Sequence, residues 1–137
     1  MGNIYIAGIA MTVFGRHPDL GLEDLARDAL DGALRDAGCE ASAIGAAYYA
    51  GVTNGPLQGQ SAIPGQVVFS KIGIEGIPIF NVENACASGA TAVHLAKQAL
   101  ELGLYDTVLV WGVEALTQLG GGTIPLQEGH AFMEEGG

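Results

Sequence analysis

Cys86 lies where an apolar extended segment, Ile77 to Val82, gives way to a helix built from very small residues. A thiol at the N-terminus of a helix faces unpaired backbone N–H groups and the positive end of the helix dipole, and both favour the thiolate form. Small neighbours such as Ala85 and Gly89 allow another backbone or a thin ligand to approach closely. This combination of residue types suits a covalent nucleophile.

The cysteines also have a structural interpretation. Cysteine is among the most buried residue types, so Cys86 could simply fill space in an alanine-rich helix. Cys39 follows a predicted helix end, beside Gly38, and is interpreted as structural filler. The two cysteines are far apart and have no Cys-x-x-Cys spacing, so the sequence predicts neither a disulfide framework nor a metal site.

The composition limits the classes of partner. A chain of 137 residues is one domain's worth, and its formal net charge of −10 argues against nucleic acid, because phosphate binding needs clustered Lys and Arg. Only 15% of the residues are charged, so we expect another part of the protein or another subunit to cover much of the surface. The apolar start, Ile4 to Phe14, follows no basic residue and is too short to cross a bilayer. We therefore expect a cytoplasmic protein that does not enter the membrane.

Strand and helix patterns alternate along the chain and predict a layered α/β fold with a mostly parallel sheet. The apolar run at 107–113 is typical of the middle of such a sheet. The helix after Cys86 has polar residues on one narrow stripe only, so we expect it to be nearly buried, with material on both sides. The chain then belongs to a larger assembly. The expected strands are 3–13, 44–52, 78–82 and 107–113, and the expected helices are 22–37, 65–72 and 85–102.

Residues 84–89, Asn-Ala-Cys-Ala-Ser-Gly, resemble the nucleophilic-cysteine motif of the thiolases, particularly the branch similar to sterol carrier protein x and the lipid-transfer-type thiolases. Three other segments agree in order and spacing: 8–16 with the first strand, 26–38 with the first helix, and 106–114 with the strand and Gly-x-Glu turn after the nucleophile helix. The resemblance covers only the N-terminal portion of a thiolase. It implies the thiolase-like α/β/α fold, with a core at 1–119, the start of an incomplete loop region at 120–137, and an absent C-terminal half.

The resemblance implies acyl transfer with coenzyme A thioesters. In the family the cysteine attacks a 3-ketoacyl-CoA, acetyl-CoA leaves, and free CoA collects the shortened acyl group; the reverse direction is condensation. Cys86 is the counterpart of that nucleophile, and its backbone N–H is expected to help hold an oxyanion. Gln60, in a Gly-Gln element after Gln58, is expected to bind substrate together with Ser88 and Gly89. Coenzyme A enters as a co-substrate, and no bound cofactor or metal is expected.

The departures from the family pattern are informative. Thiolases take an Asn-Glu-Ala-Phe-type segment, a catalytic histidine and commonly a second cysteine from their C-terminal half, and this sequence has none of these motifs. His17 is interpreted as a loop residue, His94 as a surface residue, and His130 as part of an acidic tail. We therefore expect the chain to be inactive without a C-terminal half or partner subunit. A homo- or hetero-oligomer is expected, and the branch suggests a zinc-ribbon and OB-fold acyl-CoA-binding protein as a further partner.

Three alternatives stay open. The first is a condensing enzyme like ketoacyl synthase III or hydroxymethylglutaryl-CoA synthase, which shares the fold and a cysteine at a helix start. The second is an aldolase that reuses the fold, in which loss of Cys86 would leave activity largely intact. The third belongs to another class: a non-catalytic scaffold subunit that stabilises a complete paralogue.

Overall fold

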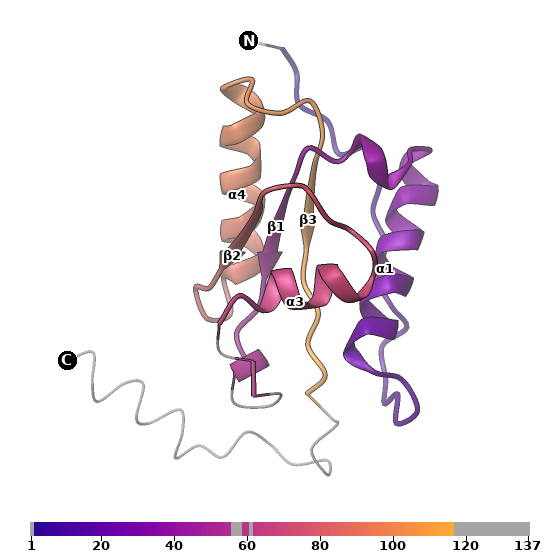
Figure 1. Ribbon diagram of the computed structural model, residues 1–137. Coiled ribbons are helices and arrows are strands. Elements are labelled where there is room, and N and C mark those ends of the chain that lie inside the picture. The colour runs from indigo at the N-terminus through magenta and orange to yellow at the C-terminus, as the bar shows by residue number, and fades with distance from the viewer. Residues whose placement is uncertain (1, 56–58, 61, 117–137) are drawn as a thin grey trace, which may run out of the picture.

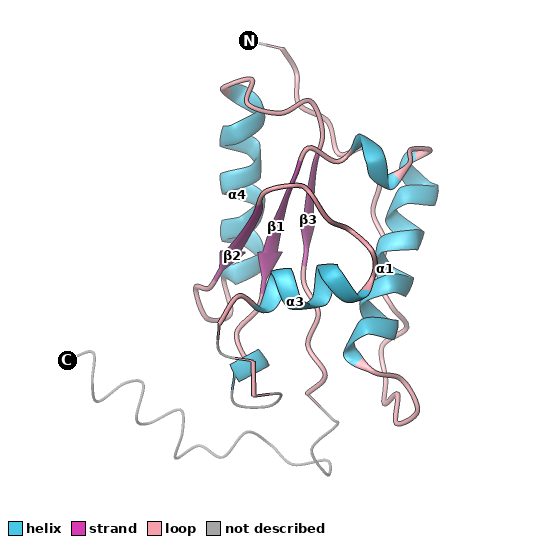
Figure 2. Cartoon of the chain, viewed as in Figure 1, coloured by secondary structure: helices cyan, strands magenta, loops and turns pink. Residues whose placement is uncertain are grey.

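The computed structural model describes residues 2–55, 59–60 and 62–116, and these form a parallel sheet between helices. The strand order is β2-β1-β3, so β1 lies in the middle of the described sheet. Helix α4 covers one face, and helices α1 and α3 cover the other (Figures 1 and 2). The expected α/β class is confirmed. In chain order the elements are α1 (Leu22–Ala37), a short 3-10 helix (Ala41–Ala43), β1 (Ala46–Ala50), α3 (Pro64–Lys71), β2 (Ile79–Val82), α4 (Ser88–Glu101) and β3 (Val108–Trp111).

Helix α1 has the bounds that its apolar periodicity predicts. At its start the Asp24 carboxylate accepts a hydrogen bond from the backbone N–H of Gly21, 2.9 Å away, which satisfies one of the N–H groups that a helix start leaves free. At its end Gly38 is left-handed, with φ 64°, and the next N–H, from Cys39, returns to the Leu34 carbonyl at 3.1 Å. Both ends are therefore encoded locally.

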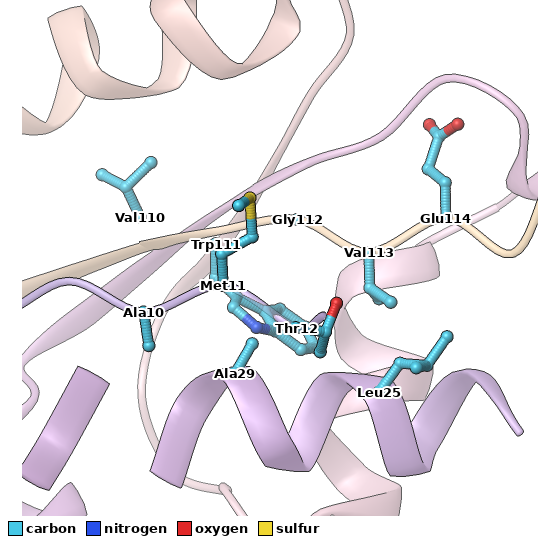
Figure 3. Close-up of a pocket in the computed structure, with 10 residues that line it drawn as sticks. All are labelled: Ala10, Met11, Thr12, Leu25, Ala29, Val110, Trp111, Gly112, Val113 and Glu114. Atoms are coloured by element: carbon cyan, nitrogen blue, oxygen red, sulfur yellow. The ribbon is translucent and has the colours of Figure 1, made fainter. Parts of the chain in front are cut away.

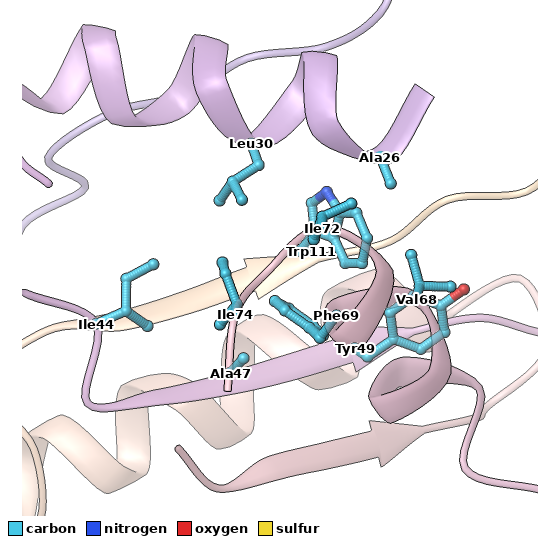
Figure 4. Close-up of a cluster of buried hydrophobic side chains, with 10 residues drawn as sticks. All are labelled: Ala26, Leu30, Ile44, Ala47, Tyr49, Val68, Phe69, Ile72, Ile74 and Trp111. Atoms are coloured by element: carbon cyan, nitrogen blue, oxygen red, sulfur yellow. The ribbon is translucent and has the colours of Figure 1, made fainter. Parts of the chain in front are cut away.

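The sheet separates two apolar clusters because successive strand residues point to opposite faces. On one face Tyr48 and Val82 pack with the alanines of α4. On the other face Tyr49 and Phe69 are completely buried, and the Phe69 and Trp111 ring centroids are 4.8 Å apart. Figure 4 shows this second cluster, which comprises Ala26, Leu30, Ile44, Ala47, Tyr49, Val68, Phe69, Ile72, Ile74 and Trp111.

The N-terminal segment corrects one prediction. Residues 3–13 were expected to form a strand, but the structure shows an extended chain there with no assigned strand. It lies along α1, where the Ile9 N–H donates to the Asp36 carboxylate at 2.8 Å. Gly8 allows this approach, since a Cβ on it would be 2.5 Å from the Ala33 carbonyl oxygen. β-forming residues describe a strand only when a neighbouring strand pairs with them, and α1 offers no such ladder.

Two further expectations differ from the structure. Strand β3 is at an edge of the described sheet rather than in its middle. Helix α4 begins at Ser88 instead of Ala85, and only one stripe of it is buried, because the described residues cover it from one side. Val93, away from that stripe, is 54% exposed. The other helices and strands agree with prediction to within a few residues at each end.

Gly112, directly after β3, lets the backbone there approach Ala50 at the end of β1 closely. A Cβ on Gly112 would be 2.5 Å from the backbone carbonyl oxygen of Ala50. We expect Gly112→Ala to lower the free energy of unfolding by about 1–3 kcal/mol, because the backbone must shift. Gly89→Ala is the matched control, since nothing lies within 4 Å of its Cβ. Urea unfolding of both variants is the measurement, and equal midpoints would contradict the prediction.

Candidate active site

Cys86 lies in the connection 83–87 between the end of β2 and the start of α4, and its side chain is exposed. The preceding residue, Ala85, has φ 45°, a left-handed conformation that is costly for a residue with a Cβ. This conformation turns the chain sharply and delays the helix to Ser88. Gly89, in the first turn of α4, is also exposed and leaves open space beside it. The thiol is thus presented at a strand-to-helix junction, as predicted.

Ser88 holds this turn in place. Its side chain is buried, and its Oγ accepts a hydrogen bond from the Asn84 N–H at 2.8 Å and donates one to the Ala85 carbonyl at 2.7 Å. The Asn84 side chain donates in turn to the Thr91 hydroxyl, 2.9 Å away. The Glu83 carboxylate accepts a hydrogen bond from the Ala85 N–H at 2.7 Å. These bonds offset the strain at Ala85 and fix the backbone on both sides of Cys86.

A second connection begins beside the Cys86 turn. All three described strands are parallel, so their carboxyl ends lie at one edge of the sheet. Ala50 at the end of β1 is paired with Val82 at the end of β2, and the Gly51 N–H reaches the Val82 carbonyl at 3.3 Å. The loop after β1 therefore starts next to the segment that leads to Cys86.

Glu114, three residues after β3, binds that loop. Its carboxylate accepts hydrogen bonds from the backbone N–H groups of Val52 and Thr53, at 2.5 and 3.1 Å, and from the Thr53 hydroxyl, at 2.5 Å. The sequence places Glu114 in a Gly-x-Glu turn but does not predict these contacts. The signal available from sequence is a carboxylate directly after the apolar run at 107–113, which predicts a strand.

Asn54, within this loop, is hydrogen-bonded to Tyr49 of β1, and both residues are buried. The Asn54 amide donates to the Tyr49 hydroxyl at 2.9 Å, and that hydroxyl donates to the Val113 carbonyl at 3.1 Å. Burial raises the pKa of Tyr49 to about 12; the Asn54 hydrogen bond opposes this shift, and the nearby Glu114 charge adds to it. Tyr49 is therefore a neutral hydrogen-bonding residue at physiological pH.

The predicted substrate-binding residues take different positions. Gln60 belongs to the second loop: its N–H bonds to the Asn54 carbonyl at 3.0 Å, and its side-chain amide donates to the Ala62 carbonyl. The Ser88 hydroxyl is occupied by the turn, and Gly89 is open to solvent. Substrate contacts from these residues stay predictions. Gln58 and His130 lie outside the described residues.

The described part of the chain places neither His17 nor His94 as a base for Cys86. The ring of His17 is 2.7 Å from the Val13 carbonyl in the loop before α1, and His94 is exposed on α4. Among the described residues no group of three or more metal-ligating side chains gathers at one point. The nucleophilic side chain that this part of the chain exposes beside α4 is the Cys86 thiol.

A pocket of about 230 Å³ lies elsewhere, between residues 10–12, α1 and the end of β3 (Figure 3). Cys86 is not among its lining residues, so it is not the space into which the thiol opens. Trp111 forms one wall, and its Nε1 is buried without a hydrogen-bond partner among the described residues. Figure 3 also shows that the side chains of Val113 and Glu114, both at the pocket, point to opposite sides of the chain; the Glu114 carboxylate binds the loop after β1.

The fold and the site define a layered α/β protein that presents a thiol between a parallel strand and a helix. The chain belongs to the thiolase family: the family model "Thiolase, N-terminal domain" matches residues 4–126. The resemblance to the N-terminal portion of the thiolases is thereby confirmed. Of the described helices, none is both long and apolar enough to cross a membrane.

Individual relatives agree with the family. Sterol carrier protein 2 of Gallus gallus is 35% identical, over 84% of this chain and 20% of that protein. Benzoylsuccinyl-CoA thiolase subunit BbsB of Thauera aromatica is 35% identical, over 94% of this chain and 31% of that protein. The chain thus spans between a fifth and a third of these curated relatives.

Solved structures show the same fold. The acetyl-CoA acetyltransferase from Syntrophomonas wolfei superposes with a TM-score of 0.65 and 28% identity, covering 77% of this chain and 27% of that one. A 3-oxoacyl-(acyl carrier protein) synthase III from Xanthomonas oryzae gives a TM-score of 0.58 with 28% identity, covering 69% and 27%. The likeness therefore extends across thiolases and condensing enzymes.

Ser88→Ala tests the support of the Cys86 turn. We expect the free energy of unfolding to fall by about 1–3 kcal/mol, because the part-buried Asn84 N–H loses its acceptor and the Ala85 carbonyl loses the donor that the buried Ser88 hydroxyl supplies. Ser70→Ala is the matched control: its exposed hydroxyl bonds only within α3, to the Val67 carbonyl. Thermal and urea unfolding measure the difference, and a Ser88 variant as stable as the Ser70 variant would contradict this account of the turn.

Tyr49 makes stability depend on alkaline pH. Because its pKa is higher in the folded state than its ordinary value of 10.0, its contribution is complete below pH 10 and is lost as the pH rises towards 12. We expect the wild type to lose about 2 kcal/mol of unfolding free energy over that interval through this group. Tyr49→Phe should flatten this part of the profile, whereas Tyr5→Phe, at an exposed position, should not. Parallel profiles for all three proteins would refute the assignment.

Proposed function

We propose that this chain supplies the nucleophile of a thiolase reaction, with Cys86 carrying the acyl group between a 3-ketoacyl-CoA and free CoA. The observation that carries the proposal is the exposed Cys86 thiol in a fixed, strained turn between β2 and α4, in a chain of the thiolase family. Thiolase and acetyltransferase relatives support the reaction class. The acyl-enzyme on Cys86 is our inference for this chain.

In the proposed cleavage the Cys86 sulfur attacks the ketone carbon of the substrate. The carbon–carbon bond to the neighbouring methylene breaks, the electron pair stays on the acetyl-CoA fragment, and a proton from a general acid completes that product. The shortened acyl group remains on sulfur as a thioester. The thiolate of CoA then attacks this thioester, and Cys86 leaves with the electron pair. A thiolate serves both steps, since it is a good nucleophile and a good leaving group.

The described residues contribute position and dipole. The turn held by Ser88 and Asn84 presents the thiol beside the first turn of α4, where backbone N–H groups have no acceptor within the helix. The Cys86 N–H lies two residues before α4, and it is proposed to bind the oxyanion of the tetrahedral intermediate. Gln60, Ser88 and Gly89 are proposed to contact the acyl-CoA.

The proton donor and acceptor are proposed to come from another polypeptide segment, in the same chain or in a partner. The relatives are three to five times longer than the matched region, and one of them is named as a subunit. We propose that 1–119 is the N-terminal core and that the C-terminal half completes the site. With a net charge of −10, this chain is a poor surface for the phosphates of CoA, so their binding is assigned to that half or to an acyl-CoA-binding partner.

A condensing synthase is the second candidate, favoured by the structural likeness to 3-oxoacyl-(acyl carrier protein) synthase III. Such an enzyme would also load an acyl group on Cys86 but would not release acetyl-CoA from a 3-ketoacyl-CoA. An aldolase would work without the thiol, and a scaffold subunit would leave Cys86 unacylated. Acylation and cleavage assays, with and without the Cys86 thiol, therefore separate the four candidates.

We would purify the chain natively, with whatever copurifies, incubate it briefly with 3-oxohexanoyl-CoA and quench with acid. Peptide mass spectrometry should find a butanoyl group on the Cys86 peptide, and chromatography should find acetyl-CoA released. Cys86→Ala should abolish both signals, and Cys39→Ala is the matched control that should retain them.

The other outcomes point to the alternatives. Acylation from butanoyl-CoA without cleavage of the ketoacyl substrate would favour a condensing synthase. Retro-aldol cleavage of a 3-hydroxyacyl-CoA that survives Cys86→Ala would favour an aldolase. An unmodified Cys86 in a complex that contains the complementary half would contradict the thiolase mechanism and favour the scaffold subunit.

A further inference from the structure

Glu114 joins the two connections at the carboxyl edge of the sheet and has no part in the reaction proposed above. It lies after the edge strand β3, yet its carboxylate binds the loop after the central strand β1. The loop so bound begins beside the Cys86 turn. Glu114 therefore sits where it can affect substrate without touching the thiol.

The carboxylate is well matched to the loop. It accepts from three donors within two residues, the N–H groups of Val52 and Thr53 and the Thr53 hydroxyl. A carboxylate has acceptor sites only, so it can satisfy all three together, and hydrogen bonds to a charged acceptor are the strong ones. The anion thus fixes both the backbone and a side chain at the start of the loop.

The contact extends to Gln60 through Asn54. Thr53 precedes the buried Asn54, whose amide is anchored on the Tyr49 hydroxyl. The Asn54 carbonyl accepts the N–H of Gln60 at 3.0 Å, and the Gly59 N–H bonds to the Gly55 carbonyl at 2.9 Å. The position of Gln60 is consequently set by the same short stretch that Glu114 holds.

The backbone that carries Glu114 is fixed relative to Cys86 through the ends of the three strands. Ala50 is paired with Val82, and Gly112 packs directly on the Ala50 carbonyl, so the three strand ends have little freedom to slide past one another. Glu114 follows Gly112 by two residues, and Cys86 follows Val82 by four. A shift of the Glu114 carboxylate would move the loop relative to the thiol.

We propose that Glu114 is a positioning residue that holds residues 52–54, and through Asn54 also Gln60, in a fixed position relative to Cys86, so that the acyl-CoA thioester is bound in line with the thiol. This inference rests on the proposed function, because it assigns the loop to acyl-CoA binding. The carboxylate acts through the loop and does not contact the reacting atoms. Its loss should weaken substrate binding while leaving the reactivity of the thiol intact.

The test compares Glu114→Ala and Glu114→Gln with wild type in the native complex. Glu101→Ala is the matched control, because Glu101 ends α4 at the opposite end from Cys86 and pairs with Lys97. The rate of Cys86 acylation is measured against 3-oxohexanoyl-CoA concentration. The rate of Cys86 alkylation by iodoacetamide is measured without substrate, since this small reagent does not need the loop.

We expect Glu114→Ala to raise the half-saturating substrate concentration roughly tenfold, the size that loss of one or two hydrogen bonds predicts. The maximal acylation rate and the alkylation rate should stay within about threefold of wild type, as for loss of uniform binding. Glu114→Gln should recover most of the affinity, because its carbonyl can accept the two backbone N–H groups and the Thr53 hydroxyl can reverse its role.

Three results would overturn the inference alone: a Glu114→Ala affinity equal to that of Glu101→Ala, an equal fall in alkylation and acylation, or a glutamine variant as weak as the alanine variant. Hydrogen exchange of the 52–54 peptide adds a substrate-free check. It should accelerate in Glu114→Ala, and unchanged exchange would also refute the positioning role. A wild type that is never acylated would instead overturn the proposed function, and the substrate role of the loop with it.

Discussion

The parallel pairing of β1 with both β2 and β3 is the interaction on which the rest of the structure depends. It brings three strand ends, far apart in sequence, to one edge of the sheet, where the Cys86 turn, the loop after β1 and Glu114 meet. Parallel strands need long crossovers, and α3 and α4 supply them while covering opposite faces (Figure 1). A change that loosened this pairing would separate the thiol from the loop even if each connection kept its own hydrogen bonds.

The site combines a strained backbone with a rigid support. Ala85 has a left-handed backbone conformation that is unfavourable for a residue with a Cβ. Hydrogen bonds of Ser88, Asn84 and Glu83 stabilise it. Beneath the neighbouring loop, Tyr49 is completely buried against Trp111 and remains neutral at physiological pH. The exposed thiol and the loop after β1 therefore follow strands whose residues are packed in the two apolar clusters of the sheet.

Much of this could be predicted from sequence where the signal is local. The stripe of α1 and its Gly38 cap define that helix, and the change from β-formers to small residues locates Cys86 at a junction. Non-local features escaped prediction. Residues 3–13 have strand propensity, but pairing decides the outcome, and the burial of α4 depends on what else covers it. The contact between Glu114 and Thr53 joins residues 61 positions apart, which no periodicity encodes.

The extended N-terminal segment leaves large apolar side chains in water: Phe14 is 94% exposed and Ile6 is 83% exposed. Self-association of the isolated chain is then opposed by electrostatic repulsion between molecules, because each carries a net charge of −10 near neutral pH. That repulsion disappears near the isoelectric point of about 4.4 and is screened by salt. Several of the same carboxylates, Asp24, Asp36 and Glu114 among them, also accept structural hydrogen bonds, so acid removes the repulsion between copies and these contacts together.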